Sequence, residues 1–225
     1  MFSFFVNDIN KPITDNLFHH IANVIRKKEG DFFILYDNVN SYKVKITDVL
    51  SSSINFEIVE KYDKISKKTN ITLIQGYPKG QKPEFICKYA TMFGVDNIIF
   101  TYMKRSIPTI NNPGSKLQRY KNIIVEASNL SKRVDIPNIE IVNSISDIDF
   151  SIFDDIFLAY EDEDNNRIDI SKCINKNIAV IVGPEGGIDK KEIEYLKTKK
   201  TNIITLGKNI LSTEAAILAF LSLFL

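Results

Sequence analysis

The chain has 225 residues and a formal net charge of +1, with 44% hydrophobic and 25% charged residues. This is the composition of an ordinary globular protein with one large or two modest domains, and no apolar run approaches the roughly 20 residues that a membrane-spanning helix needs. The sequence shows no secretion signal, and Cys87 and Cys173 have no metal-ligand spacing, so we expect a cytoplasmic protein without a metal site.

The first seventy residues have the pattern of a small β-rich domain. A helix is predicted over about 14–28, followed by a strand over 30–37. Two further segments, beginning at Tyr42 and Ile54, alternate apolar and polar residues, which is typical of half-buried antiparallel strands. We therefore predict a small barrel, followed by a polar linker over 61–70.

Beyond Ile71 short apolar runs alternate with helical patterns, which predicts a parallel α/β sheet with flanking helices. The expected strands cover 71–75, 97–101, 156–160, 178–182 and 203–206. The expected helices cover 83–93, 116–130, 190–199 and 213–224. From Ala215 to Leu225 only Ser222 is polar, so the last helix favours burial against a second subunit, or wholly within a larger core.

The sequence "GPEGG" at Gly183 to Gly187 follows a predicted buried strand. Asp189 and Glu192 resemble a capping box, so a helix is expected to begin there. Ligands of open α/β sheets bind at the carboxyl ends of strands. The loop fits neither phosphate-binding motif, and its glutamate would repel phosphate. A neutral or cationic ligand fits better, and a tight turn without any ligand is the alternative.

A second loop, "LGKNILSTEAA" from Leu206 to Ala216, also connects a predicted strand to a predicted helix. Gly207 lies at the end of the strand, and Ser212, Thr213 and Glu214 open the helix. Two glycine-bearing loops at the ends of two strands are expected to wall one pocket.

These two loops resemble the hallmark loops of the 16S ribosomal RNA uridine N3-methyltransferase family, whose members have the knotted SPOUT fold. "HHIANVIRKKEGD" from His19, "PKGQKPEFICKYATMFGV" from Pro78 and "RYKNIIVEASNLSKRVDIP" from Arg119 resemble the family's segments in the same order. The resemblance implies a PUA-like RNA-binding β-barrel over 1–70 and a SPOUT methyltransferase domain with a trefoil knot over 71–225. It also implies S-adenosylmethionine as cofactor, a homodimer, and 16S rRNA of the small ribosomal subunit as substrate.

Transfer of the family's site to this sequence gives two sets of residues. The expected cofactor-binding residues are Leu158, Ala159, Tyr160, Gly183, Pro184, Glu185, Gly186, Gly187, Leu206, Gly207, Ile210, Leu211, Ser212, Glu214 and Ala215. The expected RNA-binding residues are Arg26, Lys79, Lys82, Lys104, Arg105, Arg119 and Arg133.

The catalytic candidates follow from the reaction, because the uracil imide must lose a proton before it accepts a methyl group. Arg105 and Arg133 are the candidate cations, and Glu185 and Glu214 are the candidate proton acceptors. A surface ion pair or a helix-cap interaction is the alternative role for each of them.

The sequence departs from the family at Met92, Leu130, Ser212 and Ala215, and Ser212 replaces an arginine beside the cofactor loop. Two other functions therefore stay open. One is a non-catalytic RNA-binding protein that keeps the fold, and the other is a related knotted methyltransferase that acts on transfer RNA.

Overall fold

The computed structural model describes residues 2–37, 39–63, 69–107, 113–133, 135–161, 163 and 165–225. Their contacts divide the chain into two compact units. The first unit is Met1–Ser66 with Ser128–Ile136, and the second is Lys67–Ala127 with Pro137–Leu225.

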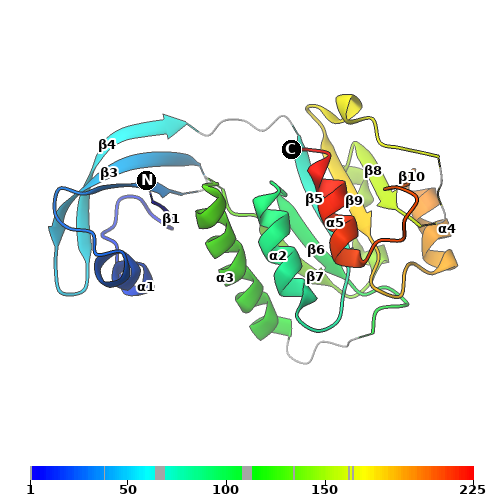
Figure 1. Ribbon diagram of the computed structural model, residues 1–225, viewed down its shortest axis with the longest axis horizontal. Coiled ribbons are helices and arrows are strands. Elements are labelled where there is room, and N and C mark those ends of the chain that lie inside the picture. Colours follow the sequence, from blue (N-terminus) through cyan, green and yellow to red (C-terminus); the bar gives the residue numbers. More distant parts are fainter. Residues whose placement is uncertain are drawn as a thin grey trace. The chain divides into compact units, whose positions relative to one another are not determined.

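The first unit contains a four-stranded sheet in the order β1-β2-β3-β4 (Figure 1). Its strands are β1 (Ser3–Phe5), β2 (Phe32–Tyr36), β3 (Asn40–Val49) and β4 (Ile54–Asp63). Strand β1 runs parallel to β2, whereas the β2-β3 and β3-β4 pairs are antiparallel. Alternate residues of the strands, such as Phe33, Leu35, Val44 and Ile46, are fully buried in one apolar cluster. The alternation of the sequence thus sets which face of the sheet is buried.

The helix predicted over 14–28 is shorter than expected. It consists of α1 (Asp15–His19) and a π-helical turn over His20–Val24. Arg26 has a left-handed backbone with φ of +60°, and the Lys27 amide donates to the Ile21 carbonyl oxygen at 3.0 Å. A hydrogen bond from an amide to the carbonyl oxygen six residues earlier, next to a left-handed residue, is typical of a helix C-terminus. The helix therefore ends before Lys28.

The predicted bounds of the linker, 61–70, are wrong at both ends. Strand β4 continues to Asp63, and β5 (Asn70–Gly76) begins within the predicted linker. Residues 64–68 of that linker lie outside the described residues. The backbone pairing of β4 with β3, in which Lys61 lies opposite Tyr42, outweighs the polar composition of the segment.

The second unit is built on a six-stranded, all-parallel sheet in the order β10-β8-β9-β5-β6-β7. The strands that follow β5 are β6 (Asn97–Thr101), β7 (Asn138–Val142), β8 (Asp155–Ala159), β9 (Asn177–Val182) and β10 (Asn202–Ile204). The helices are α2 (Lys82–Met92), α3 (Pro113–Ser131, of which the residues from Ser128 belong to the first unit), α4 (Lys190–Thr198) and α5 (Thr213–Ser222). Strand β7 was not among the predicted strands, and neither was β1.

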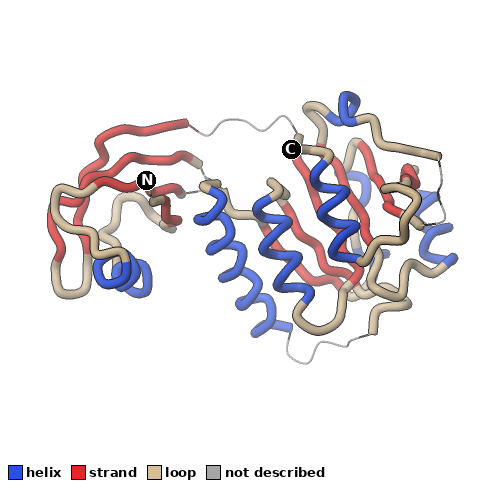
Figure 2. Tube along the Cα trace, in the orientation of Figure 1, coloured by secondary structure: helices blue, strands red, loops and turns tan. Residues whose placement is uncertain are grey.

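Helices α2 and α5 lie over the face of this sheet that is toward the viewer in Figure 2, and the two faces bury different sets of side chains. Ile74, Leu158 and Ile181 pack in one cluster with residues of α4 and of the short 3-10 turns at 145–147 and 150–152. Helices α2 and α5 contact each other, α5 contacts β9, and Tyr120 of α3 packs on Phe100 of β6. None of the described helices has both the length and the apolar character needed to cross a membrane.

Strands β5 and β9 are neighbours in the sheet. The connection after β5 leads to β6 on one side of this pair, and the connection after β9 leads to β10 on the other side, so their carboxyl ends form a topological switch point. Gly76 ends β5, and Gly183 directly follows β9. A Cβ atom at Gly76 would clash with Pro184, whose backbone nitrogen would be 2.6 Å away, and with Met103 Sδ at 2.9 Å. Only glycine allows the "GPEGG" loop to lie this close to β5.

We expect Gly76→Ala to displace this loop, because the added methyl meets backbone and proline ring atoms that cannot move separately. The variant should lose about 1–3 kcal/mol of unfolding free energy in a denaturant titration. Gly114→Ala, in the exposed first turn of α3, is the matched control and should be neutral or slightly stabilising. Equal stability of the two variants would contradict the close approach.

Candidate functional site

The "GPEGG" loop connects the buried strand β9 to the N-terminus of α4. Within it the Gly187 amide donates to the Pro184 carbonyl oxygen at 2.9 Å, and Gly187 has φ of +71°. The predicted capping box is confirmed, since Asp189 accepts from the Lys191 amide at 3.1 Å and Glu192 accepts from the Asp189 amide at 3.1 Å. A tight turn and a capped helix therefore fix both ends of the loop.

The second loop leaves β10 after Ile204 and enters α5 at Thr213. Gly207 has φ of +140°, and a Cβ atom on it would meet no other atom within 4 Å. Ser212 is the N-cap of α5, and its Oγ accepts from the Ala215 amide at 3.3 Å. The residue that replaces the family's arginine therefore has a local structural role as a helix cap.

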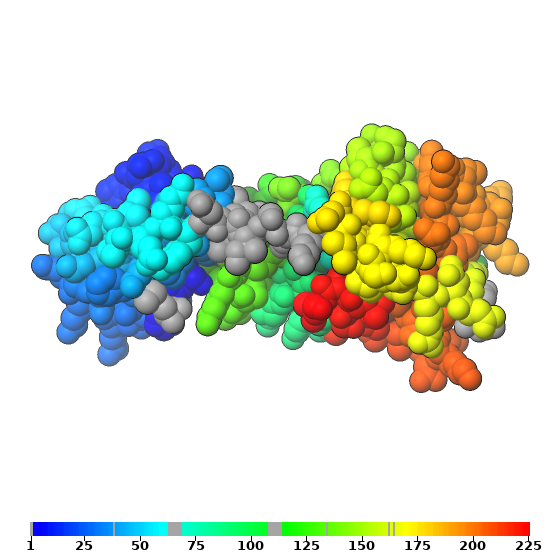
Figure 3. Space-filling view, turned by 90° about the horizontal axis from the view of Figure 1, so that it is seen from above, coloured from blue at the N-terminus to red at the C-terminus, as the bar shows by residue number. Residues whose placement is uncertain are grey.

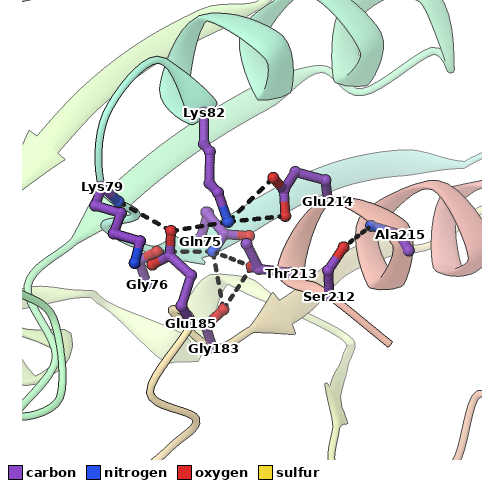
Figure 4. A network of polar contacts seen from close by, with 10 residues as sticks. All are labelled: Gln75, Gly76, Lys79, Lys82, Gly183, Glu185, Ser212, Thr213, Glu214 and Ala215. Carbon is purple, nitrogen blue, oxygen red and sulfur yellow. Dashed lines mark hydrogen bonds and ion pairs between the residues drawn. The ribbon is translucent and has the colours of Figure 1, made fainter. Parts of the chain in front are cut away.

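Gln75, which is fully buried in β5, joins the two loops to the sheet (Figure 4). Its Nε2 donates to the carbonyl oxygens of Gly76 at 2.7 Å and Gly183 at 3.0 Å, and to Thr213 Oγ1 at 3.0 Å. Thr213 Oγ1 in turn donates to the Gly183 carbonyl oxygen at 2.7 Å. The roles of both residues were not predicted, because a glutamine in a buried strand and a threonine at a helix start have no distinctive spacing.

The two loops and the end of β8 surround a cavity of about 380 Å³, within the size range of small-molecule sites. Its lining residues come from three segments of the second unit, 159–161, 182–188 and 205–216. The prediction that the two glycine loops wall one pocket is thus confirmed.

Most of the predicted cofactor-binding residues line this cavity, namely Ala159, Tyr160, Gly183, Pro184, Glu185, Gly187, Leu206, Gly207, Ile210, Leu211 and Ser212. Four do not. Leu158 is fully buried in the core, and Gly186, Glu214 and Ala215 lie outside the lining. The lining also contains residues that the sequence did not suggest, namely Glu161, Val182, Ile188, Thr205, Asn209, Thr213 and Ala216.

The charged residues in the lining indicate which kind of ligand the cavity favours. Glu161 and Glu185 are in the lining, and no lysine or arginine is among the described residues that line it. A lining that contains carboxylates and contributes no cation of its own disfavours phosphate and favours a ligand that carries positive charge. The structure therefore agrees with the neutral or cationic ligand expected from the sequence.

Lys82, at the start of α2, lies between the two candidate proton acceptors (Figure 4). Its Nζ is 3.0 Å from Glu185 Oε1 and 3.1 Å from Glu214 Oε1. Burial raises the pKa of Glu214, but its own backbone amide, Lys82 and the Ser212 hydroxyl outweigh that effect, so the pKa is lowered overall. Burial likewise opposes the charge of Lys82, and the two carboxylates raise its pKa overall.

The two candidate catalytic arginines lie in different units. Arg105 donates from Nη1 to the Gly186 carbonyl oxygen at 3.1 Å, and a Cβ atom on Gly186 would be 3.0 Å from Arg105 Cβ. Arg133 belongs to the first unit, where its guanidinium pairs with Asp135 at 3.1 and 3.2 Å and its side chain is 8% exposed. Arg105 therefore packs against the "GPEGG" loop, whereas Arg133 is held in an ion pair.

Several predicted RNA-binding cations also have partners within the chain. Lys104 pairs with Asp189 at 3.0 Å, and Arg119 pairs with Glu84 at 3.3 Å. The Lys104 ammonium is the main reason that the pKa of Asp189 is lowered. Arg26 and Lys79 are exposed.

Comparison with known proteins gives the class of the chain. Residues 66–225 match an RNA methyltransferase domain family, and residues 13–59 match an RNA methyltransferase PUA domain. The chain therefore belongs to the RNA methyltransferase family, and the fold class and family predicted from the sequence are confirmed.

The names of the relatives are more specific than the descriptions of the two domain families. The chain is 30% identical to ribosomal RNA small subunit methyltransferase E of Mesomycoplasma hyopneumoniae over 229 residues, covering 99% of this chain and 98% of the relative. It is 29% identical to the Rickettsia conorii protein of the same name, covering 90% of this chain and 84% of the relative.

Solved structures share the fold along nearly the whole chain. Ribosomal RNA small subunit methyltransferase E from Neisseria gonorrhoeae, bound to S-adenosyl methionine, superposes with a TM-score of 0.87 at 24% identity, covering 99% of this chain and 96% of that one. A Legionella pneumophila methyltransferase in complex with the same cofactor gives 0.81 at 19% identity, covering 100% of this chain and 96% of that one.

Thr213→Val tests the link between the loops. The change keeps the shape of the side chain but removes the hydroxyl that bonds Gly183 and Gln75, so it should cost about 1–3 kcal/mol of unfolding free energy. Thr198→Val, which removes an exposed hydroxyl bonded to the Tyr195 carbonyl oxygen, is the control and should change stability much less. Thermal or denaturant unfolding measures both, and equal losses would contradict the proposed link.

The ion pair of Glu214 should make stability depend on acid pH. Because its pKa is lowered from 4.5 in the folded chain, the pair stabilises fully above pH 4.5, and that stability is lost as pH falls through the folded pKa. Glu214→Gln should therefore reduce the unfolding free energy near neutral pH, with the difference from the wild type shrinking below pH 4.5. A difference that stays constant across this range would exclude the ion pair as its cause.

Proposed function

We propose that this chain is an S-adenosylmethionine-dependent methyltransferase that methylates N3 of a uridine in 16S rRNA of the small ribosomal subunit. The observation that carries the proposal is the acid-lined cavity between the two glycine loops at the carboxyl ends of the parallel strands. The family match and the names of the relatives support the RNA substrate, and the cofactor named in the two solved structures supports the cofactor.

The residues of the cavity fit this cofactor. Its size suits a nucleoside with an amino-acid tail, and Glu161 and Glu185 suit the positive charge of a sulfonium and an ammonium group. Gly207 leaves the adjoining space open, and the apolar side chains of Val182, Ile188 and Leu206 offer contact to a planar base. When bound, the sulfonium supplies an electrophilic methyl group and leaves as a neutral thioether.

The protein's own residues would then position the substrate and handle one proton. Glu185 is the better placed of the two candidate acceptors, because it lines the cavity and Glu214 does not. Arg105 would support the loop that carries Glu185 through its bond to Gly186.

RNA binding is assigned to the first unit together with exposed cations of the second. The PUA match covers most of the four-stranded sheet of the first unit. Arg26 and Lys79 are exposed, and Arg119 has a side chain that is 61% exposed, so all three are accessible to phosphate. A cytoplasmic location follows from a ribosomal substrate and is part of the proposal.

Incubation of the purified protein with 30S subunits and labelled cofactor, followed by mass spectrometry of nucleosides, tests the proposal. N3-methyluridine in 16S rRNA is the expected product. Methylation of transfer RNA instead would favour the related knotted enzymes. Binding of 16S rRNA without cofactor binding in calorimetry would favour a non-catalytic protein.

A homodimer belongs to the proposal, and so does the trefoil knot. The residues at the end of α5 and just after it differ in how far they are buried. Phe220 and Leu221 are fully buried within their own chain, whereas Leu223 is 42% exposed and Leu225 is 81% exposed. The C-terminal residues form part of the molecular surface in Figure 3. A second copy of the chain that packs on this end of α5 would cover the remaining apolar area.

Leu223→Asp should lower the dimer population in light scattering, because it places a charge without a partner in the contact. The folded monomer should tolerate it, since the side chain is exposed there. Phe220→Asp is unsuitable for this purpose, because the buried ring belongs to the core. A Leu223→Asp protein that stays dimeric would place the contact elsewhere.

A further inference from the structure

The position of Lys82 indicates a role that differs from contact with RNA phosphates. Its Nζ lies within ion-pair distance of three carboxylate oxygens, Glu185 Oε1 at 3.0 Å and Glu214 Oε1 and Oε2 at 3.1 and 3.2 Å (Figure 4). Its ammonium group donates to Glu214 Oε2, and the carboxylate of Glu185 adds a second acidic partner. Its side chain is only 28% exposed, which further limits access by a phosphate.

The contact joins three segments that are far apart in the sequence. Lys82 follows the loop between β5 and α2, Glu185 is in the loop between β9 and α4, and Glu214 is in the first turn of α5. The Lys79 amide adds a bond to Glu185 Oε1 at 3.2 Å. Glu185 is thus held from two sides by the segment Lys79–Lys82 while it lines the cavity.

The balance of charge makes Lys82 essential to this arrangement. The charged side chains that face it are Glu185 from the β9–α4 loop and Glu214 from α5, and the acid of its own helix, Glu84, pairs with Arg119. Without the ammonium group, two carboxylates would face each other with no cation between them, and their repulsion would favour separation or protonation.

We infer that Lys82 is a positioning residue that holds the ionised Glu185 carboxylate at the cavity, where it accepts the proton of the uracil imide. In that step the N3–H bond breaks, an O–H bond forms on Glu185, and the electron pair stays on N3 as the nucleophile. The inference rests on the proposed function and deepens it, because it names the residue that orders the proton acceptor.

Three variants test it: Lys82→Gln, Lys82→Arg and the control Lys88→Gln. Lys88 is exposed on the same helix and contacts only the Tyr89 ring among the interactions described for it, so its change removes the same charge at a distance from the site. Lys82→Gln should lower kcat by about tenfold to a hundredfold, as expected for a misplaced catalytic group. It should leave KM for rRNA within about twofold and move the acid limb of the kcat profile to higher pH.

Lys82→Arg keeps the charge and should restore the position of the acid limb, and Lys88→Gln should match the wild type. A raised KM for rRNA with unchanged kcat and pH profile would overturn the inference and return Lys82 to phosphate contact. An unchanged Lys82→Gln enzyme would overturn it as well.

A second readout needs neither cofactor nor activity. Carboxylate titration by NMR in the free protein should show that Lys82→Gln raises the pKa of Glu214, because the ammonium group that lowers it is removed. An unchanged pKa would contradict the bridging geometry. If the wild type titrates as expected but methylates no RNA, the proposed function fails while the bridging geometry of Lys82 stands.

Discussion

The carboxamide of Gln75 is the interaction on which the site depends. It is fully buried at the end of β5, and it bonds the carbonyl oxygens of two strand ends and the hydroxyl at the start of α5. Buried carbonyl oxygens without partners are costly, so the donors of Gln75 fix where the two loops begin. Gly76 is needed for the same arrangement, because any side chain at this position would displace Pro184.

The chemistry of the cavity follows from that arrangement. Once the loops are held at the switch point, their backbone and apolar side chains enclose about 380 Å³ with two carboxylates and no cation in the lining. Lys82 lies outside the lining and balances the charge of Glu185, so the net negative charge of the lining comes from Glu161. Helix α2 therefore contributes to the fold of the second unit and, through its first residue Lys82, to the site.

Much of this architecture can be predicted from the sequence, for identifiable reasons. Buried five-residue apolar runs such as Ile178 to Val182 and the capping pair Asp189 and Glu192 locate the first loop without any structural knowledge. The early end of the first helix was beyond prediction, because Arg26 adopts a left-handed backbone that its residue type does not favour. The extra length of β4 depends on pairing with β3, which local composition does not reveal.

The roles of charged residues were the hardest to predict, because a sequence gives the number of charges and not their partners. Lys82, Lys104, Arg119 and Arg133 were all expected to contact RNA, yet each has a carboxylate partner within the chain. Ser212 shows the reverse case, since a departure from the family pattern has a plain role as the cap of α5. Only the positions of Glu185 and Glu214 relative to the cavity separate the two candidate acceptors.

The central claim is that the cavity between the two glycine loops holds S-adenosylmethionine. A crystal structure of the protein grown with this cofactor tests the claim most directly. The account predicts cofactor density between the "GPEGG" loop and the segment 205–216, with its positive groups near Glu161 or Glu185. Cofactor density at any other place, or a cavity left empty at saturating cofactor, would contradict it.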